Sequence, residues 1–414
     1  MIKLLFLLFP LLVSAQSDSI LVLKNVSLII GDGSPMKEHA NLVIMGDTIA
    51  SISYGENFTY PGAKILDYEN HYIMPGLVDA HVHISDEQET LEDRTKLEEL
   101  LEFTIRGGVT SIRDMAGDNR ILADVSRAAM LKILLSPDIY YSALFAGPEF
   151  FSDPRTHMSA KGEVAGEVPW MKAITSTTNM ELAVAEAKGT GASAIKIYGA
   201  LDNVLVDKIT KEAHKQGMLV WSHATVFPAS PSDMITAGVD AVSHGTLLIW
   251  EEEKLPESFE KRYKADYSID PFKSKKLKEL LEKMAQENII LDATVFVYQV
   301  DPKDTTVTPE QKARAKFACE ITKLAHSLGV LVAAGSDNLG NPGEKQLPNL
   351  YDEIELLVNE CGFQPMEAIR AATQVSAMAT GIIENAGTLE VGKKADLLIL
   401  NKSPIQRIEN IRTL

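Results

Sequence analysis

The segment "GTGASAIKIYG" (residues 189–199) contains the unit that decides the fold. A helix ending at a glycine is followed at once by a short apolar run that favours a buried strand. The same unit recurs in five other segments, each with a Gly or Asn that can take the left-handed conformation ending a helix. They are "RGGVTSIRDM" (106–115), "KQGMLVWSHA" (215–224), "TAGVDAVSHG" (236–245), "QENIILDATV" (286–295) and "SLGVLVAAGSD" (327–337). Repeated helix, cap and buried strand predict a parallel sheet.

Two further apolar segments bring the number of predicted strands to eight. "MPGLVDAHVH" (74–83) supplies the first strand and "DIYYSALFAG" (138–147) the third. Eight parallel strands alternating with helices close into a barrel, so we predict an α/β protein with a (β/α)8 TIM barrel. A doubly wound open sheet uses the same elements and is the structural alternative.

Both ends of the chain have a different texture from the middle. Residues 20–70 alternate apolar and polar side chains in short runs separated by turn sequences such as "GDGSP" and "YPGA", and "AGTLEVGKKADLLILNKSP" (386–404) is similar. This pattern is typical of antiparallel strands. We therefore predict a composite β-sandwich domain from residues 16–72 and 383–414, beside a barrel of residues 73–382.

The first segment, "MIKLLFLLFPLLVSAQ" (1–16), has the layout of a secretory signal peptide. Lys3 precedes a short apolar core, and the small residues Ser14 and Ala15 follow it. We predict a signal peptide over residues 1–15, cleaved near Ala15, and hence a periplasmic or secreted protein. The apolar run is too short for a membrane-spanning helix, which needs about 20 residues, and no later segment reaches that length.

The composition limits the partners of this chain. Its 414 residues carry a formal charge of −17, which disfavours nucleic acid and anionic membrane surfaces as partners. A small-molecule substrate is the partner we expect, and a homo-oligomer remains open.

Several polar side chains stand at the carboxyl ends of the predicted strands. His81 and His83 in "DAHVHIS" are two residues apart, so strand alternation directs both toward one face. A single strand histidine is most often a hydrogen-bonded core residue. Residues of this kind on five strands, all at the same end of the barrel, predict a metal site. The set consists of His81, His83, Lys196, His223, His244 and Asp337.

Lys196 is the one charged side chain within its apolar strand. An unpaired buried ammonium costs several kcal/mol or loses its proton. The neutral amine can take up carbon dioxide as a carbamate, an anionic group able to bridge two divalent cations. A Schiff base with a substrate and a salt bridge to a carboxylate are the alternatives. Neither alternative accounts for the four histidines nearby.

The ordered set "MPGLVDAHVH", "IKIYG", "WSHA", "SHGT" and "AGSD" resembles the amidohydrolase superfamily, and in particular its imidazolonepropionase-like branch, which includes Xaa-Pro dipeptidases. The resemblance extends to "GVTSIRDM", "MEAIRAATQVSAMATGI" and "GTLEVGKKADLLIL" and covers nearly the whole mature chain. Each motif alone is weak, but their order is specific.

The resemblance implies a site with two divalent metal ions, with zinc expected, although such ligands also accept manganese, cobalt or iron. His81, His83 and Asp337 would hold one metal, His223 and His244 the other, and carboxylated Lys196 would bridge them. A hydroxide between the metals would be the nucleophile, and Asp337 would act as general base and then general acid.

Residues that contact the substrate are less clearly marked. His157, in the long connection 146–180, and Tyr198, after strand four, are candidates, with Tyr198 a donor to the oxyanion; packing or surface roles are equally open. Arg113 on strand two could meet a substrate carboxylate, but a structural ion pair with Asp114 or a neighbour is favoured. The second long connection, 246–272, also lies at the predicted active face and could serve as a lid.

These features predict an exported hydrolase of an amide bond in a small substrate such as a dipeptide. A cyclic amide, an ester or a lactone is the alternative substrate. Thr225 stands where prolidase-like relatives often have an aromatic residue, which puts proline specificity in doubt. "HATVFPAS" (223–230) lacks the glutamate of the deaminases, so deamination is disfavoured. A non-catalytic binding protein is the alternative outside the enzymes, and the complete ligand set argues against it.

Overall fold

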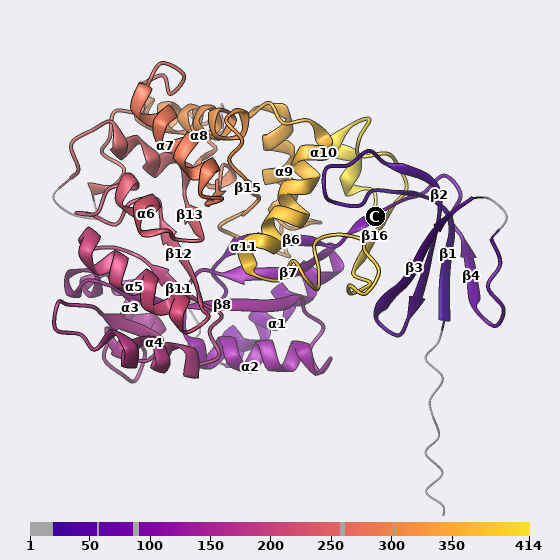
Figure 1. The fold of residues 1–414 in the computed structure, drawn as a ribbon, viewed down its shortest axis with the longest axis horizontal. Coiled ribbons are helices and arrows are strands. Elements are labelled where there is room, and N and C mark those ends of the chain that lie inside the picture. Colours follow the sequence, from indigo (N-terminus) through magenta and orange to yellow (C-terminus); the bar gives the residue numbers. More distant parts are fainter. Residues whose placement is uncertain (1–19, 56–57, 86–90, 257–260, 302) are drawn as a thin grey trace, which may run out of the picture.

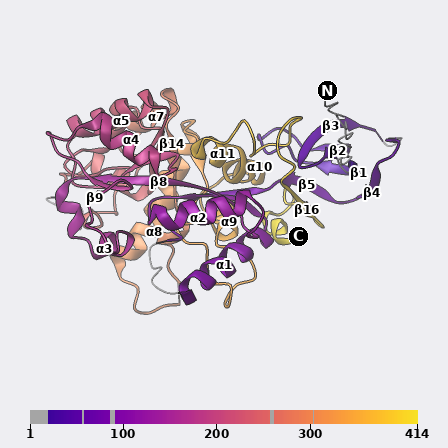
Figure 2. The same ribbon diagram turned by 90° about the horizontal axis from the view of Figure 1, so that it is seen from below.

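The computed structural model describes residues 20–55, 58–85, 91–256, 261–301 and 303–414. The predicted signal peptide, residues 1–15, lies outside the described residues. Within the described part, no helix is long and apolar enough to cross a membrane. The β-rich ends of the chain form a unit at one end of the long axis, and the barrel occupies the other (Figures 1 and 2).

Eight parallel strands form the barrel. The pairing order runs from β15 through β14, β13, β12, β11 and β8 to β7 and β6. Backbone bonds from Ala80 N to Ala334 O (3.0 Å) and from Asp337 N to His81 O (2.8 Å) join the first strand to the last. The predicted α/β TIM barrel is therefore confirmed, and the open-sheet alternative is wrong. The strands are β6 (Leu77–Val82), β7 (Val109–Asp114), β8 (Asp138–Ala146), β11 (Ala194–Ile197), β12 (Leu219–His223), β13 (Ala241–Ser243), β14 (Ile290–Asp292) and β15 (Val332–Ala333).

Helices surround the barrel and pack their apolar faces on its strands (Figure 1). The residues predicted to end a helix before a strand have positive φ angles of 56° to 87°; they are Gly108, Gly191, Gly217, Gly238, Asn288 and Gly329. The helices are α1 (Leu91–Arg106), α2 (Asn119–Met130), α4 (Met180–Gly189), α5 (Asn203–Lys215), α6 (Pro231–Ala237), α7 (Lys275–Gln286), α8 (Pro309–Ser327), α9 (Leu350–Asn359), α10 (Pro365–Arg370) and α11 (Ser376–Thr380), with a π-turn at Ala371–Val375.

An apolar cluster fills the barrel interior. It is centred on Trp221, which is fully buried, and on small side chains from the neighbouring strands such as Ala194 and Ala241. Val375 and Ala379 from the C-terminal helical segment belong to the same cluster. The interior is therefore a packed core rather than a channel.

The two chain ends build one six-stranded sheet, in the order β16-β5-β1-β2-β3 with β4 also paired to β1. The pairing of Leu398 with Met74 ties the C-terminal segment to the N-terminal one. The domain boundaries, 16–72 with 383–414 and 73–382, stay predictions. The strands are β1 (Ile20–Leu28), β2 (Lys37–Met45), β3 (Thr48–Tyr54), β4 (Lys64–Asp67), β5 (Tyr72–Pro75) and β16 (Leu397–Leu400), followed by the 3-10 helix η6 (Ile408–Arg412).

The long connections after strands three and six have structure of their own. The first contains η1 (Pro148–Ser152), α3 (Pro154–Ser159), β9 (Glu167–Val168) and β10 (Met171–Ala173). Strand β10 pairs in parallel with β8, with Met171 opposite Leu144, so this connection is anchored to the sheet. The second begins with η2 (Gly245–Glu251), and η4 (Phe296–Tyr298) follows strand β14.

Candidate metal centre

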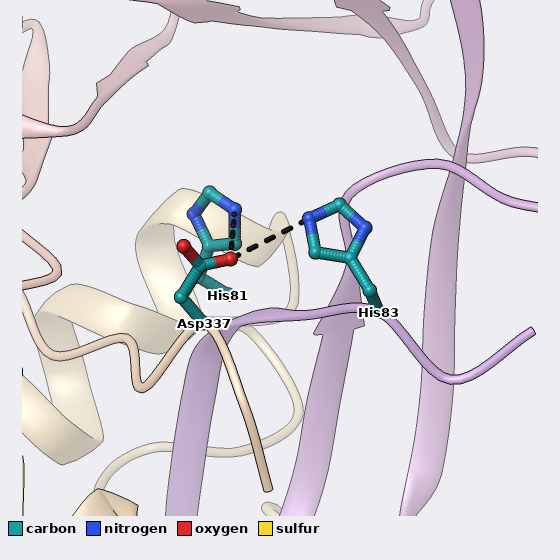
Figure 3. A group of neighbouring side chains, drawn as sticks. All are labelled: His81, His83 and Asp337. Atoms are coloured by element: carbon teal, nitrogen blue, oxygen red, sulfur yellow. Dashed lines mark ion pairs between the residues drawn. The ribbon is translucent and has the colours of Figure 1, made fainter. Parts of the chain in front are cut away.

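Four histidine rings and one carboxylate converge at the carboxyl ends of the barrel strands. The ring of His81 lies 5.4 Å from that of His83 and 4.8 Å from that of His244, which lies 5.0 Å from that of His223. Oδ1 of Asp337 is 3.3 Å from Nε2 of His81 and 3.5 Å from Nε2 of His83 (Figure 3). His81, His83 and Asp337 therefore form a candidate metal-binding triad, with ligand atoms within 4.8 Å of one another.

The Nδ1 atom of each of the four histidines forms a hydrogen bond with a residue outside the histidine cluster. The carbonyls of Ala116 and Tyr198 accept from His83 and His223, so those two imidazoles carry their proton on Nδ1. The Nε2 atoms of His81 and His83 thus face the carboxylate of Asp337. The Nδ1 partners are Asp292 Oδ2 for His81 (2.6 Å), Ala116 O for His83 (3.2 Å), Tyr198 O for His223 (2.8 Å) and Thr294 Oγ1 for His244 (2.9 Å).

Nε2 of His81 is a buried atom that makes no hydrogen bond, although the Asp337 carboxylate lies close to it. Burial lowers the pKa of His81, His223 and His244 well below the usual value, and the neighbouring Lys196 lowers each further. Neutral imidazoles with inward-facing lone pairs are what a divalent cation requires. The residues at this site therefore fit a metal ion.

Lys196 lies at the end of β11, fully buried among the same residues. Its Nζ donates to Ser243 Oγ at 2.9 Å, and it forms no ion pair with a carboxylate of any described residue. Burial lowers the pKa of Lys196 to about 7, and the Arg113 guanidinium adds to this effect while Asp292 opposes it. The salt-bridge alternative for this lysine is therefore not supported.

A buried carboxylate that was not predicted, Asp292, lies beneath the histidines at the end of β14. Its Oδ2 accepts from His81 Nδ1 at 2.6 Å, from Arg113 Nη2 at 3.0 Å and from Ser243 Oγ at 3.0 Å. Burial raises the pKa of Asp292, and the positive charge of Arg113 opposes this rise. Arg113 therefore favours the ionised carboxylate that fixes the ring of His81.

Arg113 is enclosed in the barrel rather than exposed to a substrate. Its side chain is fully buried, its Nε donates to Ala80 O, and its guanidinium lies 4.7 Å from the ring centre of Trp221. The structural ion pair is present, but with Asp292 instead of Asp114.

The backbone is strained at two of the predicted ligands. His244 and Asp337 have φ angles of 68° and 58°, which non-glycine residues rarely adopt. Asp79 holds the segment before Asp337: its carboxylate accepts from Ser336 N at 2.9 Å and from Ser336 Oγ at 2.6 Å. Such strain is maintained only where the surroundings fix it, and it is concentrated at functional sites.

The sequence profile described as "Amidohydrolase family" matches residues 72–413. The chain belongs to the amidohydrolase family. Its structure superposes on a Xaa-Pro dipeptidase with methionine bound in the active site, with a TM-score of 0.71 at 22% identity, over 95% of this chain and 97% of that one. At this identity the likeness establishes the shared fold.

Among curated relatives, the imidazolonepropionase of Symbiobacterium thermophilum is 24% identical over 364 residues, which are 83% of this chain and 78% of that protein. The adenine deaminase of Staphylothermus marinus is 25% identical over 255 residues. This match covers 58% of the chain but only 38% of the deaminase. Members of the amidohydrolase family are typically metal-dependent, which agrees with the triad of His81, His83 and Asp337.

The two predicted substrate contacts differ in position within this amidohydrolase. The ring of Tyr198 lies 4.5 Å from that of His223, edge to face, so it borders the centre. His157 is exposed on α3. Tyr198 also lines a pocket together with Leu144 of β8 and Met171 of β10, and His157 is not among the residues that line this pocket. The structure does not bring His157 to the histidine cluster, and its role in substrate binding stays a prediction.

Gly335 is the residue whose enlargement we expect to disturb the centre most directly. A Cβ atom at this position would lie 2.4 Å from Asp292 Oδ1 and 2.7 Å from His81 Cβ, both packed side chains. Gly335→Ala should therefore displace the pair of His81 and Asp292 and weaken metal binding about tenfold or more. Metal titration of Gly335→Ala checks this. Gly189→Ala is the control, because Gly189 likewise lacks a positive φ angle and has open space where the Cβ atom would lie. Equal metal affinity in the two variants would contradict the prediction.

Proposed function

We propose that this protein is an exported amidohydrolase that uses two divalent metal ions, with zinc expected, to hydrolyse a carbon–nitrogen bond in a small substrate of the dipeptide class. The observation that carries the proposal is the convergence of four histidines, Asp337 and a buried lysine on one point. Export rests on the sequence of residues 1–15 alone. The dipeptide class rests on the likeness to the Xaa-Pro dipeptidase.

Each ligand has an assigned place in this proposal. His81, His83 and Asp337 would hold one cation, and His223 and His244 the other. Lys196, carrying carbon dioxide as a carbamate, would contribute to both. Bound divalent cations lower the pKa of water from 15.7 toward about 7 and polarise a substrate carbonyl.

The remaining chemistry falls to the side chains. Asp337, about 18% exposed, can reach the substrate and accept the proton of the attacking water. It would return that proton to the nitrogen of the leaving amine. Tyr198, beside His223, would donate a hydrogen bond to the oxygen of the reacting carbonyl.

A substrate screen under controlled metal content tests the proposal. Protein reconstituted with zinc is expected to hydrolyse members of a dipeptide library, and removal of metal by a chelator should abolish turnover until zinc is restored. The screen should also include cyclic amides, lactones and adenine derivatives, because the chain is similar in sequence to an imidazolonepropionase and an adenine deaminase as well as similar in fold to the dipeptidase. Turnover confined to adenine derivatives, or turnover indifferent to chelation, would contradict the proposal.

Carbamate formation at Lys196 should depend on pH in a defined direction. Only the neutral amine adds to carbon dioxide, and burial lowers the pKa of Lys196 to about 7. At fixed carbon dioxide pressure, incorporation of ¹³C into the carbamate should increase as the pH is raised through about 7 and level off above it. Carbon-13 NMR measures the signal, with Lys196→Met as the control. A signal that begins only near pH 10, as for an exposed lysine, would contradict the prediction.

A further inference from the structure

A pocket adjoins the histidine cluster on the side of strands β7, β8 and β11. Ala116 and Tyr198 form part of its lining, and their carbonyls accept the hydrogen bonds that position His83 and His223. The pocket is partly open to solvent. Ala116 and Tyr198 therefore connect the pocket to the histidine cluster, so a substrate held at the cluster can extend toward the pocket.

The inner wall of this pocket is apolar. Leu144, Phe150 and Met171 line it, and each of these side chains is buried. Met171 comes from β10, which pairs with β8 beside Leu144, so the wall is part of the sheet. The hydroxyl of Thr156, which also lines the pocket, donates to Asp153 O at 2.7 Å. A wall of this composition favours an apolar group by the free energy of removing that group from water.

An ion pair stands among the lining residues. Arg155 Nη2 lies 2.6 Å from Asp153 Oδ2, and the Asp153 carboxylate also caps α3 by accepting from Arg155 N at 3.0 Å. The hydrogen bonds from Arg155 lower the pKa of Asp153, so the carboxylate stays ionised and neutralises the guanidinium. The Arg262 guanidinium also lowers the pKa of Asp153. A substrate carboxylate would therefore have to compete with Asp153 for these guanidinium groups, and a cationic substrate group would be repelled by them.

We infer that this pocket is the specificity subsite of the enzyme. It takes an uncharged, branched aliphatic or aromatic side chain next to the scissile carbon–nitrogen bond, and the pair of Asp153 and Arg155 discriminates against charged side chains. The inference rests on the proposed function and adds to it the class of substrate side chain.

The first test removes the negative charge from the pair. Asparagine also caps helices, so Asp153→Asn keeps the start of α3 while leaving Arg155 without its carboxylate. The substrates are dipeptides of the series Xaa-Gly or Gly-Xaa, whichever the enzyme hydrolyses. We compare kcat/KM for the dipeptide in which Xaa is Glu with kcat/KM for the one in which Xaa is Leu. The ratio of these two values should be about fivefold higher in Asp153→Asn than in the wild-type enzyme. Asp118→Asn is the matched control, because Asp118 caps α2 and pairs with Arg120 in the same way without lining the pocket.

The second test enlarges the apolar wall. Met171→Ala enlarges the pocket, so it should favour the larger substrate side chain. The ratio of kcat/KM for the Trp-containing dipeptide to kcat/KM for the Leu-containing one should rise about tenfold over wild type. Val164→Ala, an exposed position in the same connection, should leave the ratio unchanged. Circular dichroism and thermal unfolding establish that each variant is folded.

The outcomes separate this inference from the function on which it rests. Wild-type hydrolysis of apolar dipeptides, with side-chain ratios that change in Asp153→Asn and Met171→Ala, supports the subsite. Hydrolysis with ratios identical in both variants and wild type overturns the subsite and leaves the proposed function standing. Failure of the wild-type enzyme to hydrolyse any amide overturns both.

Discussion

Replacing Asp337 by asparagine is expected to lower kcat by about 10²- to 10⁴-fold, the range for loss of a positioned acid or base. Asparagine has nearly the same shape and tolerates positive φ, so the backbone at φ 58° should be retained. What is lost is the negative charge that lies 3.3 Å from Nε2 of His81 and 3.5 Å from Nε2 of His83. The loss should appear in kcat more than in KM, because it affects proton transfer rather than substrate binding.

The measurement is steady-state kinetics at saturating zinc, with the metal content of each sample determined in parallel. Asp304→Asn, an exposed carboxylate in a turn, is the control for the same chemical change elsewhere. Wild-type kcat in Asp337→Asn with full metal occupancy would show that Asp337 is neither the proton acceptor nor a necessary ligand.

Replacing Asp292 is expected to have the largest effect on stability. Asp292→Leu leaves the fully buried guanidinium of Arg113 without its ion-pair partner, which should cost about 3–5 kcal/mol in the free energy of unfolding. It also removes the acceptor for His81 Nδ1, which should weaken metal binding about 10- to 100-fold. Denaturant unfolding and metal titration measure the two effects separately.

A double variant distinguishes a structural from a positioning role for Asp292. Replacing both partners of a buried ion pair by apolar residues often restores stability, so Asp292→Leu with Arg113→Met should unfold with a free energy near that of wild type. Metal affinity should stay low, because the ring of His81 still lacks its acceptor. Recovery of both properties in the double variant would show that the pair serves only the fold.

The barrel and the convergence of the four histidines with Asp337 could be predicted because their signals are local. A cap, a short apolar strand and a polar residue at its carboxyl end recur along the chain, and closure of the barrel brings those ends together. His223 and His244 were found by this rule. Asp292 closes its strand in the same way, in "ILDAT", and the rule could have identified it.

The pairing of Asp292 could not be predicted. Arg113 lies 179 positions away in the sequence and His81 lies 211 positions away, so only the closed barrel brings them into contact. The position of His157 depends on how residues 146–180 fold, and there β10 joins the sheet at β8 while α3 leaves the histidine exposed. No periodic signal in that segment indicates which side chains face the centre.

Anomalous X-ray diffraction from zinc-reconstituted crystals tests the central claim most directly. The account predicts two zinc peaks per chain, one bound by His81, His83 and Asp337 and one by His223 and His244, with density for a carbamate on Lys196 between them. A single peak elsewhere in the protein, or an unmodified Lys196 amine with no zinc at these histidines, would contradict it.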